Sequence, residues 1–145
     1  MEQTIPRYEL RKLQTDFPAV TIKSSEDACD FIKQFYGDDI DIFESSFVLL
    51  LNRANTTIGY AKISQGGLTG TVVDPRLVAK YAVESLAVSI ILAHNHPSGN
   101  LKPSTQDIDL TRKVKEGLKL LDIEVFDHLI LTSAGHYSLL ENGLM

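Results

Sequence analysis

The chain has 145 residues, of which 43% are hydrophobic, and its formal net charge is −5 at pH 7. This length and composition predict a single domain with one sizeable core. The acidic balance, with Lys and Arg scattered along the chain, offers no basic footprint for nucleic acid. No apolar run approaches the ~20 residues that span a membrane, and the N-terminus lacks the apolar core of a signal peptide. We therefore expect a cytoplasmic protein.

The predicted elements begin after an arm. Residues 1–22 are expected to form an irregular N-terminal arm, and residues 23–145 the single domain. Apolar side chains in the arm suggest that it packs somewhere rather than being fully disordered: Tyr8, Leu10, Leu13, Phe17 and Val20. Ser24, with Asp27 three residues on, is the expected N-cap of a helix that continues towards Gly37. The only cysteine, Cys29, lies on the apolar side of this helix; it excludes a disulfide framework, and a small core residue is favoured over a nucleophile.

The middle of the chain alternates strands and a helix. A continuous apolar run over Phe47–Leu51 predicts a central strand buried on both faces. A second strand is expected at about Thr57–Ile63, and a short third strand at Thr71–Val73. Asp74 followed by a proline is typical of a helix start, so a helix is expected over residues 75–86.

The last third of the chain repeats this alternation. A short buried strand over Ser89–Ala93 runs into a histidine pair, and residues 97–103 are too rich in turn formers to continue it. A helix is expected from about residue 105 to 120. Residues 124–131 and 136–140 predict a β-hairpin. Strands and helices that alternate around a mixed sheet predict a layered α/β/α domain.

The histidine pair begins the pattern that points to chemistry. Side chains two apart on a strand share a face, so His94 and His96 are expected to project together. Ser104 is the expected N-cap of the next helix, and Asp107 lies on the same side of its first turn. Ser104-x-x-Asp107 alone also describes an ordinary helix cap. Joined to the histidines, it gives two imidazoles and a carboxylate with a fourth tetrahedral position open, which is the plan of a catalytic Zn²⁺ site.

The spacing His94-x-His96-x7-Ser104-x-x-Asp107 resembles the JAMM (MPN+) signature of metalloproteases, which include deubiquitinating isopeptidases. The longer string LAHNHPSGNLKPSTQDID, with VVDPR before it and FDHLIL after it, resembles the RadC branch of that superfamily. The similarity runs from about Glu44 to the C-terminus. It implies a three-layer α/β/α sandwich with a mixed sheet, of the cytidine-deaminase-like JAB/MPN type, with a metal at one edge of the sheet.

Two rival zinc chemistries lack their ligands in this sequence. Zinc-dependent nucleobase deaminases use an H-x-E element and a P-C-x-x-C pair, and the chain has one cysteine and no H-x-E. The H-E-x-x-H helix of other metalloproteases is absent too. Deamination is therefore not expected.

A metal-activated water needs a general base, and three glutamates are candidates. Glu116 lies nine residues beyond Asp107, roughly 13 Å along a helix axis, which is too far. Glu84 is expected to face solvent from its helix. Glu44 stands just before the Phe47–Leu51 strand. The resemblance implies Glu44, because the family's upstream glutamate also precedes an apolar strand.

Other polar residues receive supporting roles. Ser104 is expected to donate a hydrogen bond to a developing oxyanion rather than bind metal. His128, inside an apolar strand, is expected to be a satisfied core histidine, with a contact to the metal ligands as the alternative. His136 is expected to be exposed. Asn95 and Ser98 are expected to order the metal loop, and Gly99 to serve a tight turn there.

Three classes of function remain open. The favoured one is a zinc-dependent metallopeptidase or isopeptidase with a peptide or protein substrate. The second is a DNA-associated accessory protein, which the family's link to DNA repair suggests and the charge does not support. The third is a non-catalytic interaction module, although such MPN scaffolds typically lack the ligand set that this chain keeps. The oligomeric state has no signal in the sequence.

Overall fold

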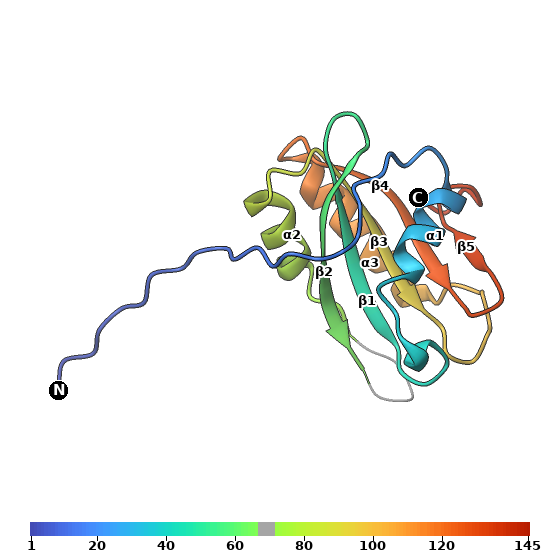
Figure 1. Ribbon diagram of the computed structural model, residues 1–145, viewed down its shortest axis with the longest axis horizontal. Helices are drawn as coiled ribbons and strands as arrows, with labels where there is room; N and C mark the ends of the chain where they lie inside the picture. The colour runs from blue at the N-terminus through green and yellow to red at the C-terminus, as the bar shows by residue number, and fades with distance from the viewer. Residues whose placement is uncertain (67–71) are drawn as a thin grey trace.

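The structure is a computed structural model that describes residues 1–66 and 72–145. Its described part contains one five-stranded mixed sheet with strand order β2-β1-β3-β4-β5 (Figure 1). The strands are β1 (Ser45–Leu51), β2 (Thr57–Gln65), β3 (Ser89–Asn95), β4 (Glu124–Leu131) and β5 (His136–Ser138). The β3–β4 pair is parallel, and the other neighbouring pairs are antiparallel. This topology places β3 at the centre of the sheet.

Helices cover both faces of the sheet (Figure 1). They are α1 (Ser25–Lys33), the 3-10 helix η1 (Asp38–Asp41), α2 (Pro75–Glu84) and α3 (Thr105–Lys119). Alternate residues of β1 and β3 pack into two separate cores, one against α2 and α3 and the other against α1. The predicted three-layer α/β/α sandwich with a mixed sheet is confirmed.

The strand at Phe47–Leu51 was expected to be buried on both faces, and every residue of β1 is buried. Leu50 and Ile90 join the core of α2 and α3, while their neighbours Leu49 and Ile91 join the core of α1. Cys29 is 1% exposed in the α1 core, and burial raises the pKa of its thiol. This confirms a core role, because a reactive cysteine needs an exposed thiolate.

Helix caps follow the predicted residues. The Ser24 side chain accepts a hydrogen bond from the Asp27 backbone N–H, and Asp74 caps α2 with a proline at its first position. The helices end earlier than predicted: α1 at Lys33 rather than near Gly37, and α2 at Glu84 rather than Leu86. Leu86 has φ +59° and turns the chain into the approach to β3, since a left-handed residue cannot continue a right-handed helix.

Two expectations are wrong in detail. Of the strand predicted at Thr71–Val73, the described residues Val72 and Val73 are outside any strand, with Val72 89% exposed, and Thr71 lies outside the described residues. Its β-branched residues have strand propensity, but that propensity reflects packing on a neighbouring strand. The last strand ends at Ser138 rather than residue 140, because the Leu140 N–H bonds to the Asp127 carboxylate and turns the chain.

The last residues of the N-terminal arm pack against the domain. Tyr8 and Leu13 are more than four-fifths exposed, so the predicted packing is wrong for them, and the arm leads away from the sheet (Figure 1). Phe17 makes ring contacts with Phe31 and Tyr60 at the α1 core. The division into residues 1–22 and 23–145 stays a prediction. Within the described ranges, no helix combines the length and apolarity needed to cross a bilayer.

Candidate metal centre

The candidate site lies where β3 ends and α3 begins. His94 is the sixth residue of β3, paired with Ser46 on one side and Ile130 on the other. His96 follows the strand, but its N–H still bonds to the Leu131 carbonyl at 2.9 Å and so continues the parallel pairing. The backbone of His94 is therefore held by β1 and β4, and that of His96 by β4.

The two imidazoles face each other through their Nε2 atoms, which are 3.1 Å apart. The outer nitrogen of His96, Nδ1, lies 2.6 Å from the Asn100 carbonyl oxygen. A carbonyl can only accept, so Nδ1 carries the hydrogen. In the neutral ring, Nε2 of His96 then holds a lone pair that points into the site.

The tautomer of His94 follows from a chain of buried hydrogen bonds. The Thr111 hydroxyl donates to the Asp107 carbonyl at 2.6 Å, so its oxygen accepts from Nδ1 of His128 at 2.5 Å. His128 is buried, and burial, reinforced by repulsion from the neighbouring His94 ring when it is protonated, lowers the pKa of His128 to about 3, which keeps the ring neutral. Its Nε2 must then accept from Nδ1 of His94 at 2.8 Å. His94, like His96, is left with its Nε2 lone pair in the site.

Two carboxylates approach the same point. Asp107 Oδ2 lies 3.4 Å from His94 Nε2 and 3.7 Å from His96 Nε2. Glu44 Oε1 lies 3.8 Å from His96 Nε2, and the ligand atoms of Glu44 and the two histidines all lie within 4.8 Å of one another. Lone pairs and carboxylate oxygens repel at such distances unless a proton or a cation lies among them. This donor set fits a divalent metal ion that accepts imidazole and carboxylate.

Electrostatics in the site hold a negative charge on Asp107. A hydrogen bond with Asp107 raises the pKa of His96 despite its partial burial. Burial alone would raise the pKa of Asp107, but interactions of its carboxylate with His94 and His96, when those rings are protonated, outweigh it and hold that pKa well below its usual range. The carboxylate is therefore ionised at neutral pH and available to a cation.

The helix cap and the site share the same atoms. The Ser104 N–H donates to Asp107 Oδ2 at 2.8 Å, and the Asp107 N–H donates to Ser104 Oγ at 3.1 Å. The capping interpretation and the metal-site interpretation therefore hold together, because the cap fixes the oxygen that faces the imidazoles. The Ser104 hydroxyl accepts in this cap and retains a hydrogen that it can donate.

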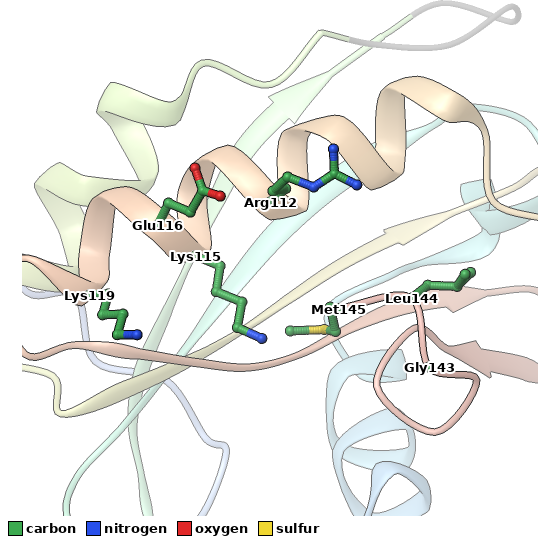
Figure 2. Close-up of a pocket in the computed structure, with 7 residues that line it drawn as sticks. All are labelled: Arg112, Lys115, Glu116, Lys119, Gly143, Leu144 and Met145. Atoms are coloured by element: carbon green, nitrogen blue, oxygen red, sulfur yellow. The ribbon is translucent and has the colours of Figure 1, made fainter.

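The structure separates the three candidate glutamates. Glu44 lies between η1 and β1 with its side chain 16% exposed, and its carboxylate faces His96. Glu84 and Glu116 are exposed on α2 and α3. Glu116 lines a separate surface cavity of about 430 Å³ between α3 and the C-terminal residues (Figure 2). Of the three, only Glu44 belongs to the candidate site.

Several smaller expectations can be compared with the structure. Gly99 has φ +84°, a left-handed turn conformation that suits glycine. Ser98 Oγ accepts from the Asn100 N–H within the loop. Asn95 does not order that loop; its amide bonds to the first residue of β1 and to the segment before it instead. His136 is half-buried rather than exposed.

The sequence interpretation missed Thr111 and Asn100. Thr111 closes the chain that orients His94, and its only sequence signal is its position four residues after Asp107 on the helix. Asn100 supplies a backbone carbonyl, and a backbone group leaves no side-chain signal.

The family follows from comparison of the sequence with known proteins. A family model described as RadC-like JAB domain matches residues 22–144. The chain belongs to the RadC-like JAB domain family. The resemblance drawn from the histidine and serine–aspartate motifs is therefore confirmed.

Curated relatives agree with this RadC-like JAB assignment. A UPF0758 protein of Flavobacterium johnsoniae is 42% identical over 123 residues, which cover 85% of this chain and 53% of that protein. A UPF0758 protein of Porphyromonas gingivalis is 46% identical over 103 residues, covering 70% of this chain and 45% of the relative. One of Syntrophomonas wolfei is 39% identical over 126 residues, covering 86% and 54%. The chain spans about half the length of these relatives.

Proposed function

We propose that this RadC-like JAB domain is a zinc-dependent metallohydrolase that cleaves a peptide or isopeptide bond. The observation that carries the proposal is the convergence of two imidazole lone pairs, 3.1 Å apart, with carboxylates from two other elements. A purely structural histidine pair has no need of two ionisable carboxylates at the same point. Membership of the JAB family supports the hydrolytic class.

His94, His96 and Asp107 would hold the metal. Asp107 is the better third ligand because its Oδ2 is near both imidazoles, whereas the contact of Glu44 is a longer 3.8 Å to His96. Three ligands leave one position for water or substrate. When bound, zinc supplies Lewis-acid chemistry and lowers the pKa of a coordinated water from ~15.7 to ~7.

Glu44 would move the proton. Its carboxylate faces His96 from the η1–β1 connection, a different segment from those that carry the three ligands. In this position Glu44 accepts a proton from the attacking water and returns it to the leaving amine, as a general base and then a general acid.

Ser104 would stabilise the charge that develops on the carbonyl oxygen. Its hydroxyl is held beside Asp107 by the helix cap and retains a hydrogen to donate. The side chain is exposed, so a substrate can reach it. A donor that is positioned before the reaction begins needs no reorganisation when the oxyanion forms.

The proposed partner is a peptide or protein that carries the scissile amide. The test incubates zinc-loaded protein with peptide and isopeptide libraries and detects cleavage by mass spectrometry. We expect cleavage that a chelator abolishes, that added zinc restores, and that Glu44→Gln lacks. Cleavage that persists at the parental rate in the chelated protein or in Glu44→Gln would contradict the proposal.

A further inference from the structure

Asn95 lies in the chain between the candidate ligands His94 and His96, and it has no role in the proposed reaction. Its side chain is 0% exposed, although an amide is among the most polar groups that a protein can bury. It is the last residue of β3, and its neighbours on either side are the two imidazoles. Such a residue must find every partner inside the protein.

Its partners all belong to the segment that carries Glu44. Oδ1 of Asn95 accepts from the Ser45 N–H at 2.7 Å. Its Nδ2 donates to the Phe43 carbonyl at 2.8 Å and to the Ile40 carbonyl at 2.6 Å. Two of these bonds are made to Phe43 and Ser45, the residues directly before and after Glu44. One planar amide therefore binds the backbone on both sides of the proposed base.

A second group reinforces the same backbone. The Tyr36 hydroxyl donates to the Ser45 carbonyl at 2.7 Å, and its ring packs edge-on against Phe47. The Glu44 carbonyl accepts from the Gly66 N–H at 2.8 Å. The carboxylate of Glu44 therefore rests on main chain that is bonded at three successive residues.

We propose that Asn95 is a positioning residue that fixes Glu44 against the His94–His96 pair. Strand β3, which leads to the two histidines, thereby also positions the carboxylate of Glu44. One residue then fixes the position of the proposed base relative to the histidine ligands. Only an amide fits: it offers one acceptor and two donors in one plane, whereas Asp lacks the donors and Ala lacks both. The consequence for catalysis rests on the proposed function; the anchoring of Glu44 does not.

The direct test measures the accessibility of the Glu44 carboxylate. Metal-free protein is treated with a carbodiimide and an amine, and the modified carboxyls are quantified by peptide mass spectrometry. In Asn95→Ala the labelling rate of Glu44 should rise at least ~5-fold, the factor that corresponds to the loss of about one buried hydrogen bond. Glu116, exposed on α3 (Figure 2), is the internal reference and should not change.

Two further variants keep the test decisive if Asn95→Ala fails to fold. Tyr36→Phe removes one hydroxyl and keeps the ring, so it should fold and raise Glu44 labelling by a smaller factor. Asn52→Ala is the matched control: its Oδ1 accepts from the Ala54 and Thr56 N–H groups at the other end of β1. It should lower the melting temperature and leave Glu44 labelling unchanged.

A rate measurement separates positioning from general damage. In single-turnover cleavage of the library substrate, Asn95→Ala should lose activity while retaining about one zinc, and adding it to Glu44→Gln should slow that variant by less than ~2-fold. Losses that multiply, or Glu44 labelling that is unchanged in folded Asn95→Ala and Tyr36→Phe, would overturn the inference. If the parent cleaves nothing, the proposed function fails, but the labelling result still decides the role of Asn95.

Discussion

The two halves of β3 are equally buried and are stabilised in opposite ways. Ile90, Ile91 and Leu92 are between 0% and 4% exposed, and so are His94 and Asn95. The first half fills two apolar cores. In the second half, Nδ1 of His94 and the amide of Asn95 have specific polar partners. One strand thus passes from packing to hydrogen bonding within a few residues.

This difference shows which interactions make the candidate site rigid. The apolar half needs only volume and shape, so conservative replacements there are tolerated. The polar half needs particular donors and acceptors, because a buried polar group without its partner is left with the full free-energy cost of desolvation. The His94 ligand is therefore fixed by the same sheet that forms the core, and the His96 N–H is bonded to that sheet as well.

The largest expected effect comes from a substitution that stops proton transfer and leaves both halves of β3 unchanged. Glu44→Gln keeps the shape of the side chain but cannot take a proton, so single-turnover cleavage should fall by ~10²–10⁴-fold. Zinc content and melting temperature should stay close to the parental values. Glu84→Gln, exposed on α2, is the control and should cleave at the parental rate. A fully active Glu44→Gln protein would remove the base from the account.

A substitution in the apolar half should do the reverse. Ile90→Ala leaves a cavity between β3 and the helices of the α2–α3 face, and should cost ~2–5 kcal/mol in the free energy of unfolding. Denaturant titration measures this cost. The folded fraction should bind zinc with the parental stoichiometry, since no polar partner is lost. Loss of zinc from folded Ile90→Ala protein would show that the two halves are not independent.

Ser104→Ala tests the α3 cap, which holds Asp107 beside the histidines at the polar end of β3. The variant should keep its zinc and lose ~10²–10³-fold in turnover, the usual cost of one oxyanion donor. Its stability should fall by ~1 kcal/mol because the α3 cap is lost with the hydroxyl. Metal analysis and single-turnover kinetics on the same preparation check both points. A folded variant without zinc would make the hydroxyl a ligand instead.

The pH dependence of stability gives the smallest effect and reports on the histidines. In metal-free protein, the raised pKa of His96 stabilises the fold at low pH, and this contribution is lost as pH rises above ~6.5. The lowered pKa of His128 acts in the opposite sense: its contribution is present above ~6.5 and is lost at ~1.4 kcal/mol per pH unit as pH falls.

Metal-free protein should therefore be most stable near pH ~6.5, whereas zinc, which needs neutral imidazoles, should add stability above that pH. Thermal melts between about pH 5 and 8, with chelator or with zinc, check this. His128→Gln should flatten the acid side of the curve. Metal-free stability that rises steadily through pH 8 would contradict the assignment of a raised pKa to His96.

Periodicity and caps carried most of what could be predicted from the sequence. Alternation on a strand put His94 and His96 on one side, and the Ser104 cap placed Asp107 near them. The contact between His128 and His94 depends on the β3–β4 register, which pairs Leu92 with His128 and is set by tertiary packing. The partners of Asn95 lie 50 to 55 positions away in the sequence, so a local pattern could not reveal them.

The central claim is that His94, His96 and Asp107 form one metal centre. Elemental analysis of purified, folded protein tests it most directly, with His96→Ala and Asp107→Ala measured beside the parent. We expect about one equivalent of zinc in the parent, a sharp fall in both variants, and a lower melting temperature of the parent after chelation. Equal zinc content in the parent and both variants, or a parent that takes up no metal, would contradict it.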